Sequence, residues 1–402
     1  MAETSIKDPR SPFASRGCRL KHHLRHKTGL DADCRCSNNR TPKSGLDPCK
    51  RPYDAAKSGV VLGGGPSFAR MHNAHLSGGF VDRPRNRLIA SVYWSGSSNG
   101  KGLIVSYDLK TWRRRFISGD YEVGQARKTA GSGPAFDHLK DVKPGSDGKW
   151  YGLSYKSRRL RIFRIEPRDG RRSVVWEAGD PKYGQCPSGT PDARSARSRV
   201  VQYTHEGFAV DRDGSFLLGY ANPIRDGRGI VRVSKDGRNC AYLTASGNRK
   251  DGLKRGSGPE MRGFVQGFTL HHGSLWAFTT GEKKLWQIDP RSGDRKVAAS
   301  RPLGERHNVW DTKRKGFWTS GFLSSVTLGA FDPQTKQFMN VFRVCCKGPS
   351  WFPLCAQGPI VINSLNYGPV FALPNGNLAL GQDSVGLVEF EPETGNSMIR
   401  SL

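Results

Sequence analysis

From about residue 59 to the C-terminus, short apolar runs alternate with clusters of Gly, Asp, Asn and Pro. Short apolar runs bounded by such turn residues are typical of β-strands, because Gly, Asn, Asp and Pro adopt the backbone angles that tight turns need. Hydrophobic residues make up 36% of the chain, and with nine Trp and nineteen Phe they suffice for a buried core. The pattern therefore predicts a folded all-β protein.

A degenerate unit occurs six times in this part of the chain. Its first half is a hairpin between two β-rich runs, with turns at Pro84–Arg87, Ser146–Lys149, Arg212–Ser215, His271–Ser274, Lys313–Gly316 and Pro374–Asn377. The Asp-Gly and Asn-Gly pairs among them are typical of primed two-residue turns. Its second half is an apolar strand that runs into a polar turn, at Val105–Asp108, Ile162–Glu166, Val231–Lys235, Leu285–Asp289, Val326–Asp332 and Leu387–Glu391.

Two hairpins per unit make a four-stranded antiparallel sheet, and the unit recurs roughly every sixty residues, as radial β-repeats do. A ring of such sheets leaves only short edges exposed, which favours a β-propeller over a two-sheet sandwich or a β-helix. We therefore predict one propeller domain over residues 59–402 with six blades. A seventh blade, built from residues 60–68 with the C-terminal strand, is the alternative count.

Residues 1–58 differ from the rest of the chain because they are basic, poor in apolar residues and rich in turn formers. Such a segment cannot form a core by itself, so we predict an irregular N-terminal arm. The arm contains four Cys and three His, whose spacing matches no standard zinc finger and favours disulfides or free thiols over a zinc site.

The charge balance is strongly basic, with 64 Lys and Arg against 35 Asp and Glu, a net charge of +29. Such a surface attracts polyanions, so we expect an anionic polysaccharide or, as another polyanion, nucleic acid as partner; cationic solubility is the plain alternative. Nine cysteines favour a secreted or periplasmic protein, although the first thirty residues contain no apolar segment of a signal peptide. No apolar run is long enough for a membrane span.

Polar residues recur in phase a few positions before each first hairpin: His75, His138, His205, Gln266, His307 and Asn366. Rotation about a propeller axis would bring equivalent positions of all blades to one mouth of the central channel. Four of these six positions are imidazoles, although the chain holds only ten histidines. The sequence therefore predicts a site at this mouth.

A second in-phase set follows each hairpin, with Tyr93, Tyr155 and Tyr220 in the first three units. Antiparallel pairing places the end of the second strand beside the start of the first, so these phenols and the histidines should share a rim. Arginines close to the in-phase positions in sequence are Arg70, Arg127, Arg199, Arg262 and Arg306.

These residues allow three interpretations. They could form hydrogen bonds between blades, since buried polar groups need partners. They could hold one divalent metal ion through His75, His138, His205, Gln266 and His307, because neutral imidazole is a common metal ligand. They could also act in acid–base catalysis, with His138, His205, Tyr155 and Tyr220 as catalytic groups and the five arginines and Tyr93 binding an anionic substrate.

The catalytic interpretation agrees with the basic charge. Removal of a proton alpha to a uronate carboxylate becomes feasible when Arg or a metal neutralises the developing charge. The combination is similar in architecture and residue types to propeller-shaped polysaccharide lyases, some of which hold a metal with His and Gln, although no family motif matches. P-loop, dinucleotide-binding, serine hydrolase and zincin motifs are also absent from the sequence. We favour a uronate polysaccharide lyase, and the alternative is a non-catalytic propeller that binds a polyanion or an acidic protein.

Overall fold

The computed structural model describes most of residues 74–401. The larger segments outside the described residues are 1–73, 95–100, 187–206, 247–254, 301–306, 321–325, 345–366 and 391–396. The predicted N-terminal arm and the segment proposed for a seventh blade both fall in the first of these.

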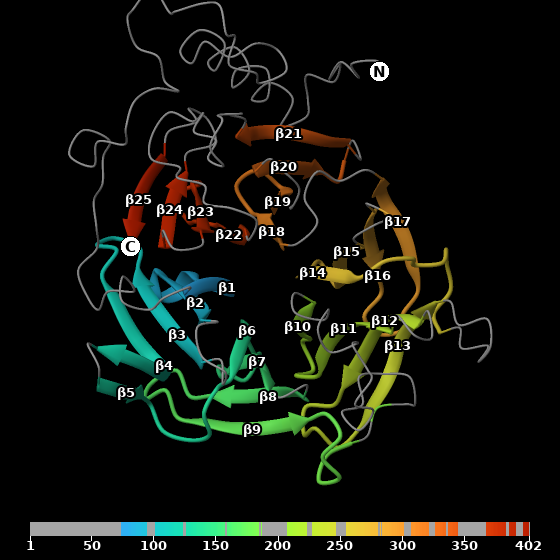
Figure 1. Cartoon of the computed structure of the whole chain (residues 1–402). Coiled ribbons are helices and arrows are strands. Elements are labelled where there is room, and N and C mark those ends of the chain that lie inside the picture. Colours follow the sequence, from blue (N-terminus) through green and yellow to red (C-terminus); the bar gives the residue numbers. More distant parts are fainter. Residues whose placement is uncertain are drawn as a thin grey trace, which may run out of the picture.

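Six antiparallel sheets surround a central axis, and in each sheet consecutive strands are neighbours (Figure 1). The innermost strands are β1 (Ala74–Asp82), β6 (His138–Pro144), β10 (Phe208–Val210), β14 (Val265–His271), β18 (His307–Asp311) and β22 (Tyr367–Ala372). The second strands are β2 (Arg87–Trp94), β7 (Trp150–Lys156), β11 (Phe216–Asn222), β15 (Ser274–Thr279), β19 (Gly316–Ser320) and β23 (Leu378–Gln382). The third strands are β3 (Lys101–Asp108), β8 (Arg159–Ile165), β12 (Gly227–Val233), β16 (Lys284–Ile288), β20 (Val326–Asp332) and β24 (Gly386–Phe390). The fourth strands are β4 (Arg114–Val123), β9 (Arg172–Glu177), β13 (Cys240–Ser246), β17 (Arg295–Ser300), β21 (Gln337–Val344) and β25 (Ser397–Ser401).

This arrangement confirms the predicted six-bladed propeller. Blade 1 carries an additional outer strand, β5 (Ala126–Ala130), which pairs with β4. The C-terminal strand β25 pairs with β24 as the outer strand of blade 6, so its predicted use in a seventh blade is wrong. The ring closes where β1 of blade 1 lies beside β22 of blade 6.

All six predicted first hairpins are present. In blade 4 His271 pairs with Ser274, and both loop residues, His272 and Gly273, have positive φ, as the predicted primed two-residue turn requires. The other five loops are longer than two residues. In blade 2 the Gly145 amide donates a hydrogen bond to the Lys149 carbonyl, and the Gly148 amide donates one to the Gly145 carbonyl. The loop between the strands therefore consists of the three residues 146–148. The third residue of every predicted turn has a positive φ: Asn86, Gly148, Gly214, Gly273, Lys315 and Gly376. A three-residue loop with one left-handed residue is the next most common hairpin loop after the two-residue turns. The Asp147 carboxylate stabilises the blade 2 loop by accepting a hydrogen bond from the Lys149 amide. A short 3-10 helix, η1 (Arg83–Arg85), forms the blade 1 hairpin.

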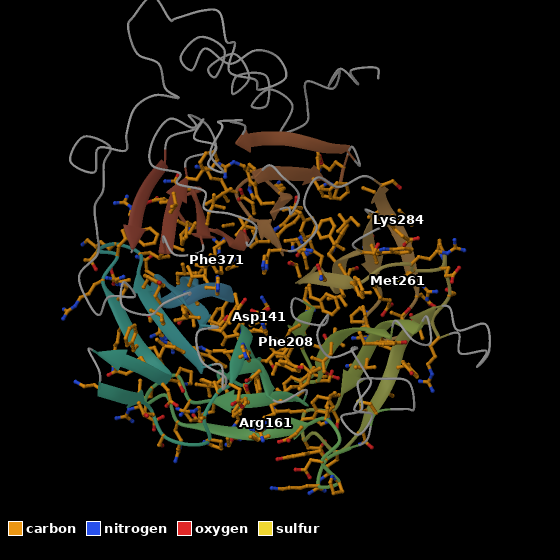
Figure 2. The ribbon with its side chains drawn as sticks, viewed as in Figure 1. Asp141, Arg161, Phe208, Met261, Lys284 and Phe371 are labelled. Carbon is orange, nitrogen blue, oxygen red and sulfur yellow. A yellow bond between two sulfur atoms is a disulfide. The ribbon has the colours of Figure 1, made fainter. Side chains whose placement is uncertain are left out.

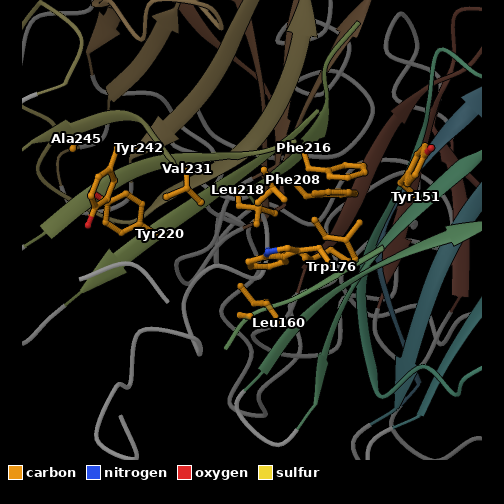
Figure 3. Packing of buried hydrophobic residues seen from close by; sticks show 14 residues of the cluster. Tyr151, Leu160, Trp176, Phe208, Phe216, Leu218, Tyr220, Val231, Tyr242 and Ala245 are labelled. Atoms are coloured by element: carbon orange, nitrogen blue, oxygen red, sulfur yellow. The ribbon is translucent and has the colours of Figure 1, made fainter. Parts of the chain in front are cut away.

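Apolar side chains fill the space between neighbouring blades. Between blades 2 and 3, Leu160 and Trp176 pack against Phe208, Phe216 and Leu218, all of them buried (Figure 3). Such interblade packing holds the sheets at fixed angles, so the starts of the inner strands keep fixed positions around the axis.

A buried arginine fixes the loop that leads into blade 2. The Arg172 guanidinium on β9 donates from Nε to the Pro134 carbonyl and from Nη1 to the Ala130 carbonyl. It also lies 5.1 Å from the ring centroid of Phe136. Arg172 thereby holds the Gly-Ser-Gly-Pro loop at residues 131–134, which ends four residues before His138.

An equivalent arginine fixes the loop that leads into blade 4. Arg295 on β17 donates from Nε to the Pro259 carbonyl at 2.8 Å and from Nη1 to the Arg255 carbonyl at 3.0 Å. The loop it holds, residues 256–259, repeats the sequence Gly-Ser-Gly-Pro. Blades 2 and 4 are therefore reached through the same supporting structure.

Candidate functional site

The in-phase positions that the structure describes lie where the inner strands begin. His138 and His307 are the first residues of β6 and β18, and His75 and Gln266 are the second residues of β1 and β14. His307 also lines a central cavity of about 330 Å³ formed by residues of all six inner strands. His205 and Asn366 lie outside the described residues.

On blades 1 and 2 the imidazoles alternate with phenols in a continuous row. Strand pairing places His75 opposite Tyr93 and His138 opposite Tyr155. The ring centroids are 5.1 Å apart for His75 and Tyr93, 5.8 Å for Tyr93 and His138, and 6.3 Å for His138 and Tyr155. We call these four side chains the His–Tyr row. The predicted pairing of imidazoles with phenols is thus present on these two blades.

Bulges interrupt the inner strands just beyond the in-phase positions. The pairing register skips residues after Leu76 in β1, after Leu139 in β6, after Gln266 in β14 and after Tyr367 in β22. Bulges often occur beside active sites because they change the direction in which a side chain points. In β6 the skipped residue is Lys140.

Lys140 places a positive charge at the His–Tyr row. Its side chain is buried, and its Nζ lies 4.0 Å from the ring centroid of Tyr93 on the neighbouring blade. Burial, and after it the charge of Lys140, lowers the pKa of His138 below its ordinary value of 6.5. His138 is therefore a neutral imidazole at neutral pH, which is the form that accepts a proton.

Arg161 on β8 pairs with two carboxylates, one of which belongs to Asp137, the residue before His138 in the chain. Arg161 Nε donates to the Glu177 carboxylate at 2.7 Å, and its Nη1 lies 3.7 Å from Asp137 Oδ2. Figure 2 shows Arg161 farther from the centre of the ring than Asp141, which belongs to the inner strand β6. These two carboxylates therefore balance the charge of Arg161.

Tyr220, a predicted catalytic phenol, lies in the apolar cluster between blades 2 and 3. Its side chain is 2% exposed, and its ring centroid is 5.3 Å from that of Tyr242 (Figure 3). Burial, with a smaller contribution from Tyr242, raises the pKa of the Tyr220 phenol. The structure thus separates Tyr220 from the rim, because its blade turns this side chain into the interblade core.

Two arginines of the predicted set, Arg127 and Arg262, belong to segments that the structure describes. Arg127 belongs to β5, the outermost strand of blade 1, far along the sheet from the inner strand. The exposed Arg262 pairs with Glu260 at 2.9 Å. The remaining predicted residues Arg70, Arg199 and Arg306 lie outside the described residues.

The sequence interpretation missed Lys140 and Arg161. A signal for Lys140 exists, since it lies two positions after His138, where a strand returns to the same face. No sequence signal predicts the bulge in β6. No signal predicts the position of Arg161 either, because its strand, β8, is joined to β6 only through β7.

The described residues do not fit the predicted metal site. They contain no group of three or more His, Cys, Asp or Glu side chains that could hold a metal ion. In the row, the Tyr93 ring contacts both His75 and His138, and the Lys140 ammonium over that ring would repel a second cation. We therefore derive no step through a metal.

One disulfide, Cys186–Cys240, joins the segment after β9 to the start of β13. This cysteine pair is consistent with an extracellular location but does not establish it. Within the described part of the chain, no helix has the length and apolar character to span a membrane.

No protein-family model and no curated protein matches the sequence. Among solved structures, the chain is similar to a protein of unknown function from Bacteroides thetaiotaomicron, with a TM-score of 0.46 and 9% identity over 85% of this chain and 72% of that one. It is also similar to virginiamycin B lyase from Staphylococcus aureus, with a TM-score of 0.42 and 12% identity over 81% and 83% of the two chains. An oligogalacturonate lyase in complex with manganese gives a TM-score of 0.43 and 13% identity over 78% of this chain and 89% of that one. At these identities the likeness concerns the fold alone.

Proposed function

We propose that the protein is an acid–base enzyme that cleaves an anionic carbohydrate by β-elimination at the His–Tyr row. The substrate class is a uronate-containing polysaccharide, whose carboxylate suits a site with a buried ammonium and a protein with a net charge of +29. The observation that carries the proposal is His138, a neutral imidazole between two phenols and close to a cation.

The reaction divides between a base and an acid. His138 takes the proton alpha to the carboxylate while the bond from the beta carbon to the glycosidic oxygen breaks. The electron pair of the broken C–H bond becomes the new carbon–carbon double bond, and a tyrosine beside His138 protonates the leaving oxygen. A cation near the carboxylate stabilises the charge that develops on it.

A panel assay tests this function. We expect one or more acidic polysaccharides to yield an unsaturated uronate, detected by its ultraviolet absorbance, while neutral polysaccharides of matched length yield none. His138→Gln should lower the rate of product formation by roughly 10²- to 10⁴-fold. His272→Gln, which changes an exposed imidazole in the blade 4 hairpin, serves as the matched control and should leave the rate unchanged.

The binding alternative is supported by the net charge of +29. It predicts a salt-sensitive complex with a polyanion and no product. If no polysaccharide in the panel yields product and the complex is equally tight with His138→Gln, the enzyme proposal fails and the binding function takes its place.

A further inference from the structure

The two tyrosines that flank His138 have different surroundings. The Tyr93 ring lies between the rings of His75 and His138, with the Lys140 ammonium 4.0 Å from its centroid. The Tyr155 ring contacts His138 on one side and packs against the apolar cluster between blades 2 and 3. The environment of Tyr93 is therefore polar and cationic, and that of Tyr155 is partly apolar.

This difference matters for proton transfer. A phenol that gives up its proton becomes negatively charged, and a nearby ammonium in a site of low dielectric constant stabilises that charge. Contact with an apolar cluster has the opposite effect, because it removes water from the charged form. Of the two, Tyr93 is the phenol better prepared to donate a proton.

We propose that Tyr93 is the catalytic acid of the elimination and that Lys140 is the positioning residue that stabilises its phenolate. This inference rests on the proposed function. It differs from the sequence interpretation, which placed Tyr155 among the catalytic groups and Tyr93 among the substrate-binding groups.

The assigned step balances. The alpha proton passes to His138, and the phenol proton of Tyr93 passes to the leaving glycosidic oxygen as its bond to carbon breaks. The products are an unsaturated uronate and a free hydroxyl, and the enzyme retains an imidazolium and a phenolate. Return of the proton from His138 to Tyr93, whose ring centroids are 5.8 Å apart, restores both groups without another reactant.

Other charged and titratable groups of the described residues lie close to the row. His75 on β1 adjoins Tyr93, and Tyr155 on β7 adjoins His138. Asp137, Arg161 and Glu177 form the ion pairs described above. Lys140 is thus the cation that the described contacts place directly on the ring of Tyr93.

Phenylalanine substitutions separate the two phenols. We expect Tyr93→Phe to lower kcat by roughly 10²-fold or more, the range for loss of a positioned acid, and Tyr155→Phe to have the smaller effect. Tyr121→Phe, in the outer strand β4 of blade 1, is the control for loss of a phenol elsewhere. A larger loss with Tyr155→Phe than with Tyr93→Phe would overturn the assignment.

Lys140 is tested by its effect on the pH profile. The rate should require His138 without its proton and Tyr93 with its proton, which gives a bell-shaped dependence of kcat/KM on pH. Removing the charge with Lys140→Met stabilises the protonated form of both groups, so both limbs should move to higher pH. Lys140→Arg should restore their positions. A merely structural role would lower the rate and leave both limbs where they are.

A titration without substrate distinguishes failure of this inference from failure of the proposed function. In isotope-labelled protein, the His138 and Tyr93 ring signals should titrate at higher pH in Lys140→Met than in the unmodified chain. Unchanged titrations would overturn the role of Lys140 even if the enzyme forms product. Shifted titrations without product from any polysaccharide would leave the electrostatic coupling intact and refute the proposed function, and with it the catalytic role of Tyr93.

Discussion

Blades 2 and 4 have the same supporting structure but different side chains at the mouth of the ring. Each follows a Gly-Ser-Gly-Pro loop that a buried arginine holds, and each inner strand has a bulge near its start. In blade 2 the in-phase position is His138, opposite Tyr155. In blade 4 it is Gln266, opposite Phe278.

The comparison shows that repetition determines the fold but not the chemistry. The supporting loops need glycine at positive φ and a buried arginine, so both copies keep these residues. The residues at the strand starts differ from blade to blade. Among the described residues, the alternating imidazoles and phenols are found on blades 1 and 2.

The largest expected effect comes from replacing His138 of blade 2 with glutamine, the residue at the equivalent position of blade 4. His138→Gln should lower kcat by roughly 10²- to 10⁴-fold, because the base is lost and the backbone is unchanged. The measurement is the rate of unsaturated product formation on the preferred polysaccharide.

A substitution at Gln266, the equivalent position in blade 4, provides the control for His138→Gln. Gln266→Ala in blade 4 should change the rate by a factor of about three or less, since the described contacts of His138 do not include this residue. Equal losses in the two variants would show that the chemistry is spread around the ring.

The next effect concerns the two buried arginines. Arg172→Met and Arg295→Met should each lower the free energy of unfolding by about 3 kcal/mol, because each removes at least two hydrogen bonds that a buried guanidinium donates to partly buried loop carbonyls. Urea unfolding measures this loss.

Activity then separates the two arginines. In buffer where both variants remain folded, Arg172→Met should lose activity at least tenfold, since its loop leads directly to His138. Arg295→Met should retain most of the activity. A larger loss of activity with Arg295→Met than with Arg172→Met would place the site on blade 4.

The smallest effect is a pH dependence at the opposite end of the blade 4 inner strand. β14 ends at His271, whose ring lies 3.6 Å from that of Trp310, and burial, with a smaller contribution from His272, lowers its pKa to about 4. Between that value and the ordinary 6.5, only the unfolded state binds the proton, so stability should rise with pH across this window. His271→Phe should flatten the rise between urea midpoints at pH 4.5 and 7, whereas an unchanged slope would contradict the buried neutral imidazole.

The sequence was sufficient for the fold and for part of the site. The hairpin turns are marked by residues such as Gly148 and Gly376 that adopt positive φ, and such local signals survive without an alignment. The pairing of His75 with Tyr93 was also predictable, because both residues occupy recurring positions of the repeat unit, one before and one after the first hairpin. Tyr220 could not be placed, because the direction of its side chain depends on the interblade cluster. Lys140 was missed because a bulge depends on strand pairing, which spacing alone does not reveal.

The central claim is that an acidic carbohydrate binds at the His–Tyr row, and histidine-selective NMR tests it most directly. Protein with isotope-labelled imidazoles is titrated with tetragalacturonate at a temperature where turnover is slow. The account predicts that the signals of His75 and His138 move together and saturate, while those of His271 and His272 in the blade 4 hairpin stay in place. Movement of the hairpin signals instead, or of none of the four, would contradict it.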